Sequence, residues 1–169
     1  NKLFSGSIDS TICVWNADTH EHLATLEGHT RSVTCLAVYG NKLFSGSSVH
    51  STISVWDADT HEHLAILGWR TSRVSCLTLY GNKLFSCNYK TIRVWDADTH
   101  EHLATLGGHT GPVTSLTLYG NKLFSGGDDS TICVWNADTH EHLATLEGHT
   151  RSVVCLTLYG NKLFSLGYD

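Results

Sequence analysis

Several features of other protein classes are missing from this 169-residue sequence. Its apolar runs are only a few residues long and are broken by Gly, Asp or His, so the sequence has no transmembrane helix and no secretory signal. The six cysteines show no Cys-x-x-Cys spacing and sit within apolar runs, where cysteine usually acts as a small hydrophobic residue. No Asn-x-Ser/Thr glycosylation acceptor occurs. We expect an intracellular, cytoplasmic protein with no membrane partner.

Charge is also sparse. Charged residues make up 16% of the chain, and the formal net charge is -5. An acidic chain lacks the basic stripe with which general nucleic-acid binders displace counterions from phosphates, so we expect no nucleic-acid partner. The twelve histidines make this charge labile, because protonating all of them changes it from -5 to +7 (-5 + 12).

A repeat of about 40 residues dominates what is present. The segment Asn-Lys-Leu-Phe-Ser starts at Asn1, Asn41, Asn82, Asn121 and Asn161, in steps of 40, 41, 39 and 40 residues. Each period also contains apolar strand-like runs and a Val-Trp-Asp/Asn segment, and most periods contain a Gly-His pair. With these motifs the chain resembles the WD40-repeat family over its whole length. The resemblance implies an all-β propeller of four-stranded antiparallel blades.

The apolar runs predict where the blades lie. Three blades are complete, at residues 33–67, 74–106 and 113–146. Residues 1–26 supply the second, third and fourth strands of a blade, and residues 153–165 supply a first and a second strand. The first and third runs of a blade are apolar on both faces, which is typical of a sheet packed between two others. We treat residues 1–169 as a single repeat array with frame-shifted ends.

Four blades are too few for a closed ring, because WD40 rings generally have seven or eight. The sequence also lacks methionine and begins inside a repeat, so Asn1 is not read as a translation start. Two alternatives remain open. Two chains could complete one eight-bladed ring as a homodimer, or the chain could be an excerpt of a longer propeller protein.

The family resemblance implies a structural hydrogen-bond network in each blade, joining a histidine, a serine, an aspartate and a tryptophan. One blade has the full set: His109, Ser125, Asp129 and Trp135. The closing blade has two alternatives: it could assemble the set from His149 with Ser5, Asp9 and Trp15, or it could offer Ser165 and Asp169 to a following blade.

The other two blades depart from this network. One keeps His29 and Trp56 but has His50 at the aspartate position. The other keeps Trp95, while Trp69-Arg70 replaces Gly-His and Tyr89 replaces the aspartate. We expect both networks to be broken or rebuilt, either by neutral change in a redundant array or in exchange for a binding surface.

Differences among the copies locate a candidate partner face. Two of the four turns in each repeat are the same in every copy, and the two that vary lie at the same end of each blade by up-and-down connectivity. The candidate partner-binding residues there are Arg31, His50, Trp69, Arg70, Arg73, Tyr89, Lys90, Asp128 and Arg151. Arginine beside aromatic residues suits an acidic or phosphorylated peptide. The competing interpretation packs Trp69 into the core and leaves the charges as a solvated rim.

Two further patterns point to metal binding or reactive thiols, but only weakly. The four Thr-His-Glu-His turns lack the helical His-Glu-x-x-His spacing of a zinc enzyme, and their first histidine fits a turn position with positive φ. Cys13 and Cys133 align with Ser54 and Arg93 and could be reactive thiols, although burial as small hydrophobic residues is favoured. We expect no metal and no cofactor.

No catalytic constellation stands out, so we expect no enzyme activity. The sequence predicts a non-catalytic scaffold or adaptor that binds a protein or peptide. The alternative class is a structural self-assembly module.

Overall fold

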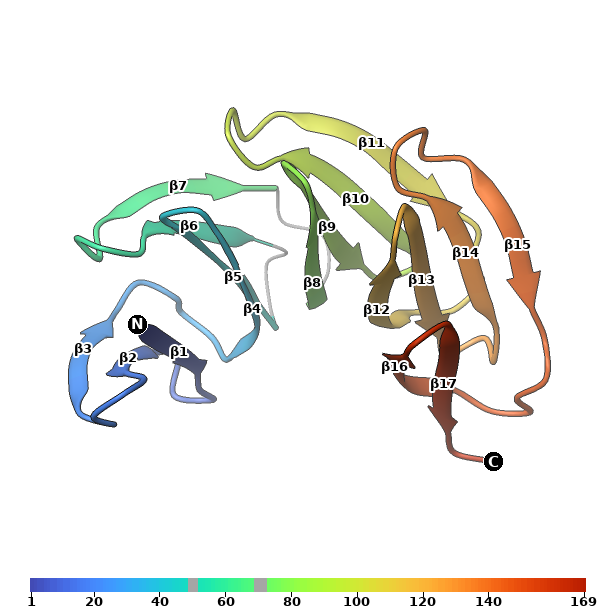
Figure 1. Ribbon diagram of the computed structural model, residues 1–169, viewed down its shortest axis with the longest axis horizontal. Helices are drawn as coiled ribbons and strands as arrows, with labels where there is room; N and C mark the ends of the chain where they lie inside the picture. Colours follow the sequence, from blue (N-terminus) through green and yellow to red (C-terminus); the bar gives the residue numbers. More distant parts are fainter. Residues whose placement is uncertain (49–51, 69–72) are drawn as a thin grey trace. The chain divides into compact units, whose positions relative to one another are not determined.

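The computed structural model describes residues 1–48, 52–68 and 73–169, and every regular element in them is a β-strand (Figure 1). The strands form antiparallel sheets in which sequence neighbours are paired, as in propeller blades. The predicted all-β fold of WD40-type blades is confirmed. The chain divides into two compact units, Asn1–Val74 and Ser75–Asp169.

The first unit contains a three-stranded and a four-stranded sheet. The three-stranded sheet has the order β1 (Lys2–Gly6), β2 (Ile12–Asn16), β3 (His22–Leu26). The four-stranded sheet has the order β4 (Val33–Tyr39), β5 (Lys42–Ser47), β6 (Ile53–Asp57), β7 (His63–Leu67).

The second unit contains two four-stranded sheets and a hairpin. The first sheet, whose first residue Val74 is the last residue of the first unit, consists of β8 (Val74–Tyr80), β9 (Lys83–Asn88), β10 (Thr91–Asp96) and β11 (His102–Gly107). The next consists of β12 (Val113–Tyr119), β13 (Lys122–Gly127), β14 (Ile132–Asn136) and β15 (His142–Leu146). The hairpin pairs β16 (Val153–Tyr159) with β17 (Lys162–Gly167).

Local sequence explains the turns and bends of these sheets. The glycine of each Tyr-Gly-Asn-Lys turn has a left-handed backbone, with φ between 55° and 58°, a region that glycine enters without steric cost. A bulge follows the valine before each tryptophan, for example between Val134 and Trp135. Bulges re-aim side chains, and this one sets each tryptophan opposite a histidine of the next strand, as Trp135 opposes His142.

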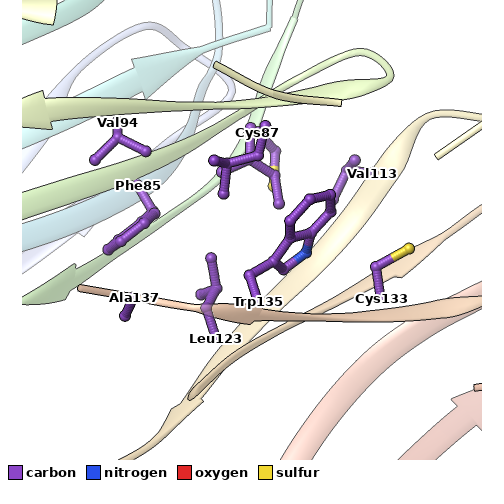
Figure 2. Packing of buried hydrophobic residues seen from close by; sticks show 10 residues of the cluster. Phe85, Cys87, Val94, Val113, Leu123, Cys133, Trp135 and Ala137 are labelled. Carbon is purple, nitrogen blue, oxygen red and sulfur yellow. The ribbon is translucent and has the colours of Figure 1, made fainter. Parts of the chain in front are cut away.

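The core of each unit forms where the faces of neighbouring sheets meet. In the second unit Phe85 and Val94 from one sheet pack with Leu123 and Trp135 from the next (Figure 2). The second strands of the complete sheets are buried on both faces, so that Leu84 and Phe85 are both fully inaccessible. The prediction named the first and third strands instead. The third strands are largely buried, as in β6, whereas the first strands are mostly half-buried, as in β4. Among the described residues, no helix is long and apolar enough to cross a membrane.

Candidate functional site

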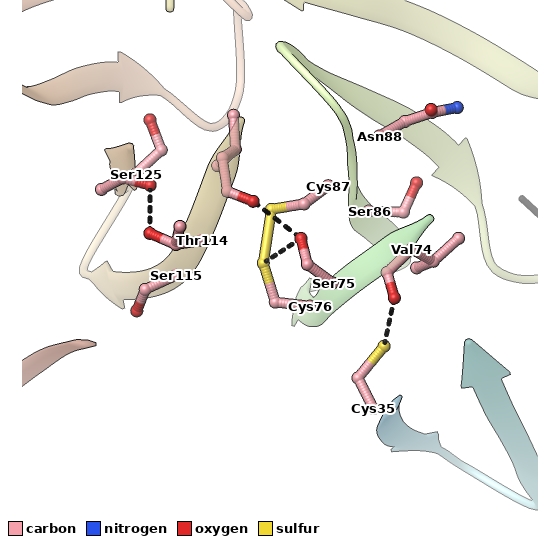
Figure 3. Close-up of a disulfide and its surroundings, with 12 residues drawn as sticks. Cys35, Val74, Ser75, Cys76, Ser86, Cys87, Asn88, Thr114, Ser115 and Ser125 are labelled. Carbon is pink, nitrogen blue, oxygen red and sulfur yellow. Dashed lines mark hydrogen bonds between the residues drawn. A yellow bond between two sulfur atoms is a disulfide. The ribbon is translucent and has the colours of Figure 1, made fainter. Parts of the chain in front are cut away.

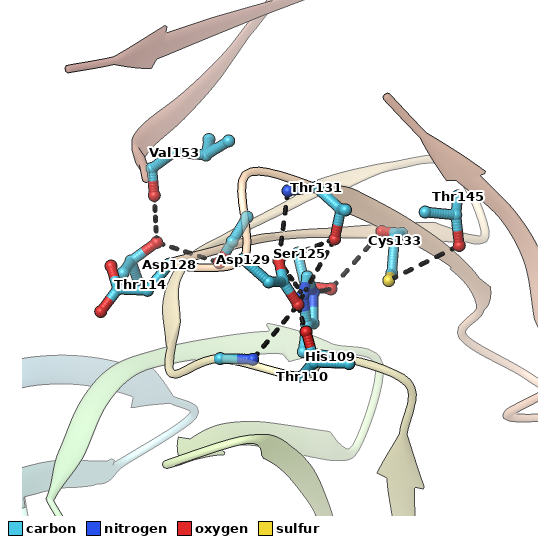
Figure 4. Close-up of polar contacts among 12 residues, drawn as sticks. His109, Thr110, Thr114, Ser125, Asp128, Asp129, Thr131, Cys133, Thr145 and Val153 are labelled. Atoms are coloured by element: carbon cyan, nitrogen blue, oxygen red, sulfur yellow. Dashed lines mark hydrogen bonds and ion pairs between the residues drawn. The ribbon is translucent and has the colours of Figure 1, made fainter. Parts of the chain in front are cut away.

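The sheet β12–β15 contains the full polar network expected from its sequence, and Figure 4 shows its histidine, serine and aspartate. His109 Nδ1 lies 3.0 Å from a carboxylate oxygen of Asp129, and His109 Nε2 lies 2.8 Å from Ser125 Oγ. The Trp135 indole N–H donates to Ser125 Oγ over 2.9 Å. Asp129 also accepts from the backbone N–H of Thr110 at 2.7 Å. A buried polar set stabilises a fold only when its members are paired, and here they are.

Charge in this network is set by Asp129 and His109. Burial alone would raise the pKa of Asp129, but hydrogen bonds from Thr131 and Thr110 and the charge of His109 lower it to about 2. Burial likewise acts to lower the pKa of His109, but its interactions with Cys133 and Asp129 outweigh burial and raise that pKa. The pair therefore favours imidazolium with carboxylate.

Part of this network persists in the sheet β4–β7. His29 Nε2 lies 2.7 Å from Ser45 Oγ, and the Trp56 indole donates to the same oxygen over 2.8 Å. The pKa of His29 is lowered, first by burial and then by the nearby His63. We expected this network to be broken or rebuilt, and its histidine, serine and tryptophan stay joined. His50, at the aspartate position, lies outside the described residues.

The sheet β8–β11 keeps only the serine and tryptophan of the network. The Trp95 indole donates to Ser86 Oγ over 2.9 Å. Tyr89, at the aspartate position, has a positive φ of 55°, and its carbonyl accepts from the Val113 N–H at 2.6 Å. In this turn, therefore, a backbone hydrogen bond to Tyr89 is present at the position where the complete network has its aspartate.

The two end sheets divide the network between them. In the first sheet the Trp15 indole donates to Ser5 Oγ over 2.8 Å, and Asp9 accepts from the N–H and hydroxyl of Thr11. These bonds lower the pKa of Asp9.

In the last sheet His149 Nε2 lies 2.7 Å from Ser165 Oγ, and His149 Nδ1 lies 2.9 Å from Asp169. Within the described residues His149 therefore bonds Ser165 and Asp169. An open pocket of about 390 Å³ adjoins this sheet. Its lining residues are Ile132, Leu146, Glu147, Gly148, His149, Leu163, Ser165 and Asp169.

Both histidines of each Thr-His-Glu-His segment have identifiable structural roles. The first histidine has positive φ in all four copies, between 64° and 68°, which confirms the predicted turn position. The second packs edge-on against the tryptophan of its sheet, as His142 does against Trp135 with ring centroids 5.0 Å apart. Among the described residues no group of three or more metal-ligating side chains gathers.

The cysteines do not all behave as small hydrophobic residues. Cys76 on β8 and Cys87 on β9 form a disulfide (Figure 3). The interpretation of the cysteines as small hydrophobic residues is wrong for these two, because the hairpin places positions 76 and 87 side by side. Cys133 is 1% exposed, as favoured, and Cys13 is half-buried. The cytoplasmic location stays a prediction, and the cysteines no longer support it.

The predicted partner-binding residues fall on loops at one end of the sheets. In the first unit Arg31 and Arg73 are exposed. In the second unit the exposed members are Tyr89, Lys90, Asp128 and Arg151. The Lys90 ammonium lies 5.5 Å from the centre of the Tyr89 ring, within cation–π range. Trp69 and Arg70 lie outside the described residues.

A lysine contact that joins neighbouring sheets at the opposite end was not predicted from the sequence. Lys2 Nζ donates to the Ala58 carbonyl over 2.8 Å. In the second unit Lys83 Nζ donates to the carbonyls of Ala137 and Asp138 over 3.1 and 2.9 Å. The sequence did contain a hint of this contact: Asn-Lys is invariant in the turn between the first and second strands, and Ala-Asp is invariant in the turn between the third and fourth strands. Lys2 and Lys83 each reach from the first kind of turn to the second kind of turn in the next sheet.

Comparison with known proteins gives matches of two kinds. The sequence model of the family described as WD domain, G-beta repeat (WD40) matches residues 20–57 and 100–136. Among curated proteins, zinc finger CCCH domain-containing protein 62 of Arabidopsis thaliana is 45% identical over 51 residues, which cover 27% of this chain and 12% of that protein.

Solved structures match over most of the chain. The computationally designed Ika8 protein matches all of it with a TM-score of 0.87 and 34% identity, and the match covers 53% of Ika8. The computationally designed Ika4 protein matches 85% of the chain, over 90% of its own length, with a TM-score of 0.78 and 34% identity. U3-55K matches 92% of the chain with a TM-score of 0.82 and 26% identity.

The chain spans about half the length of Ika8 and of U3-55K. The repeat motifs, the four-stranded sheets and these matches agree, and the chain belongs to the WD40-repeat family.

Proposed function

We propose that this chain is a non-catalytic scaffold that binds a protein or an acidic or phosphorylated peptide through the variable loops of its sheets. WD40 domains generally mediate protein–protein interaction and are typically non-catalytic. The loops concerned join the second to the third strand of a sheet and the last strand to the first strand of the next.

The contrast between the two ends of the sheets carries the proposal. At one end, the invariant turns contact each other within the chain, since Lys2 and Lys83 each donate a hydrogen bond to a turn of the neighbouring sheet. At the other end, the loops pack on one another through their backbones, as where Asp128 N–H donates to the Pro112 carbonyl over 2.8 Å. Several side chains on this second end differ between copies and are exposed, among them Arg31, Tyr89 and Arg151, which leaves them available to a partner.

The exposed groups at the variable end suit an anionic ligand. Arginine forms paired hydrogen bonds with carboxylate or phosphate, and both Arg31 and Arg151 are exposed. Tyr89 is 54% exposed and sits beside the Lys90 ammonium, so it offers apolar area next to a positive charge. Asp128 accepts a hydrogen bond from Ser152 and adds a negative group that would discriminate among peptides.

Fluorescence anisotropy with labelled acidic and phosphorylated peptides tests this proposal. The double variant Tyr89→Ala, Lys90→Ala should weaken binding of the best peptide by about tenfold or more, from loss of an aromatic anchor and a charge. The matched control is Lys122→Ala, which removes one exposed cation from the invariant end of a neighbouring sheet. The control should bind within twofold of the parent, and both variants should melt within a few degrees of it. Equal weakening by the control would show non-specific charge attraction, and no binding by any peptide would refute the ligand class.

A second function, self-assembly, is favoured by the exposed apolar residues of the end sheets. Leu3 is 58% exposed, whereas Leu43 and Leu84 at the same repeat position are fully buried. Phe164 is 51% exposed, whereas Phe85 is fully buried. Apolar sheet faces and open strand edges of this kind favour association.

We propose a homodimer of the 169-residue chain that covers these faces. Sedimentation equilibrium from micromolar to hundreds of micromolar protein should give twice the chain mass at the upper end. A single chain mass over the whole range would refute self-assembly and leave the peptide-binding proposal untouched, because the two use different residues.

A further inference from the structure

The pocket beside the last sheet has the lining of a tryptophan site. In the first unit, the apolar cluster that contains Trp56 includes Ile12, Leu26 and Leu43, which come from two sheets. In the second unit, the cluster that contains Trp135 includes the residues at the same repeat positions, Ile92, Leu106 and Leu123. The pocket is lined by Ile132, Leu146 and Leu163, which hold the same three positions of the repeat. Leu146 is 41% exposed there, against 5% for Leu106.

The polar end of the pocket matches as well. In each sheet that contains a tryptophan, the indole donates to the serine of the second strand. Ser165 has His149 as its neighbour, but among the described residues no indole donates to it. Gly108 lies against the Trp135 ring, so closely that an added Cβ would be 2.8 Å from it. Gly148, at the same repeat position, lines the pocket.

The first sheet carries the complementary half of this network. Its Trp15 and Ser5 are already joined. Oδ1 of Asp9 accepts from the N–H and hydroxyl of Thr11 at 2.9 and 2.6 Å, just as Oδ1 of Asp129 accepts from Thr131 at 3.1 and 2.7 Å. Oδ2 of Asp129 faces a histidine. Both bonds from Thr11 use Oδ1 of Asp9, so Oδ2 of Asp9 is positioned to face a histidine in the same way.

Strands β1 and β17 share the sequence Lys-Leu-Phe-Ser but differ at the next residue, which is Gly6 in β1 and Leu166 in β17. At this position glycine allows the next sheet to stack, because a Cβ on Gly6 would lie 2.6 Å from Val33. The same holds for Gly126, with 2.8 Å to Val153. Leu166 is 62% exposed and would have to move if a sheet stacked there. Strand β1 therefore fits beneath a following sheet, and β17 does not.

We propose that two copies of the chain join by strand exchange, in which β17 leaves β16 and strand β1 of the second copy takes its place. This inference rests on the self-assembly function. The backbone hydrogen bonds of β16 change little, because the incoming strand β1 and the departing strand β17 share the sequence Lys-Leu-Phe-Ser that pairs with β16. His149 then faces Ser5 and Asp9 of the second copy, and Trp15 of the second copy fills the pocket against Gly148. The gain over the free chain is burial of that indole and completion of the polar network.

Hydrogen exchange and a matched pair of serine variants test the strand exchange. In the dimer, amides of residues 2–6 should gain protection, and amides of residues 162–167 should lose it relative to dilute, monomeric protein. Ser5→Ala should weaken dimerisation about tenfold, because it removes the acceptor that Trp15 and the His149 of the other copy would share at the junction. Ser165→Ala should leave the dimer constant unchanged or strengthen dimerisation, because that strand is released.

Each contrary result has a distinct meaning. A dimer in which residues 162–167 stay protected would overturn the strand exchange and leave self-assembly standing. A dimer weakened as much by Ser165→Ala as by Ser5→Ala would lead to the same conclusion. A chain that remains monomeric at hundreds of micromolar would overturn both.

Discussion

Interactions with Cys133 and Asp129 raise the pKa of His109, and Asp129→Asn tests how much of this effect comes from the carboxylate. The sheet β4–β7 offers a natural comparison, since His29 occupies the equivalent position and bonds the equivalent serine. The pKa of His29 is lowered, by burial and by His63, whereas that of His109 is raised. We predict that Asp129→Asn brings the pKa of His109 from above its ordinary value of 6.5 to below it.

Asp129→Asn removes the carboxylate charge and leaves Cys133 in place. Asp129, whose pKa is lowered to about 2, is fully ionised near pH 6.5 and lies 3.0 Å from His109. Burial, which opposes the charged imidazole, then prevails in the variant.

The size of the stability change follows from the carboxylate. A pKa of about 2 against an ordinary 3.8 corresponds to about 2.5 kcal/mol of preference for the charged form in the folded state. Screening by solvent near the sheet edge reduces this, and we expect a loss of about 1 to 2 kcal/mol in the free energy of unfolding.

The pH dependence of this difference has a definite sign. Because the pKa of Asp129 is lowered on folding, its contribution is complete above pH 3.8 and is lost as the pH falls toward about 2. Because the pKa of His109 is raised, its contribution is complete below pH 6.5 and is lost as the pH rises through the raised value. The difference in unfolding free energy between parent and variant should therefore be largest from about pH 4 to 6.5.

Two measurements check this prediction. Histidine ring resonances followed by NMR give the pKa of His109 in parent and variant, with His29 as an internal reference that stays below 6.5 in both. Urea unfolding at several pH values gives the stability difference. The reasoning fails if His109 still titrates above 6.5 in Asp129→Asn, because a charge other than this carboxylate would then be stabilising the imidazolium.

Two further predictions concern packing and covalent stabilisation. Gly108→Ala places a Cβ 2.8 Å from the Trp135 ring and should cost about 1 to 3 kcal/mol by denaturant unfolding, whereas Gly107→Ala meets nothing within 4 Å and should be neutral or slightly stabilising. Reducing the Cys76–Cys87 disulfide, which spans 11 residues, should lower the unfolding free energy by about 2 to 3 kcal/mol, with Cys76→Ser as a control that does not respond to reductant; a parent equally insensitive to reductant would contradict the cross-link.

The fold was predictable because its information is local and repeated. The three complete blades were predicted at 33–67, 74–106 and 113–146, and the strands run from Val33 to Leu67, Val74 to Gly107 and Val113 to Leu146. Each repeat contains its own turn glycine and its own apolar runs, so comparing copies fixes the boundaries without any long-range information.

Contacts that depend on register were not predicted. Cys76 and Cys87 pair because the hairpin of β8 and β9 sets them together. The equivalent residues Cys35 and Gly46 are opposite each other in β4 and β5, so knowledge of the register would have predicted the disulfide. The choice of His149 between Ser5 and Ser165 could not be made from sequence, because both serines follow the same Asn-Lys-Leu-Phe segment.

The network also explains how one end of the sheets can vary while the core does not. The serine–tryptophan bond persists in all four sheets that have a tryptophan, at 2.8 to 2.9 Å. The histidine and aspartate, which lie in the variable loops, are the members that change. In the sheet β4–β7, whose sequence has no aspartate at this position, burial and His63 lower the pKa of His29, and His29 stays joined to Ser45. Loop residues such as Tyr89 can therefore be replaced at little cost to packing, and selection for a partner can act on this end of the sheets independently of selection for the fold.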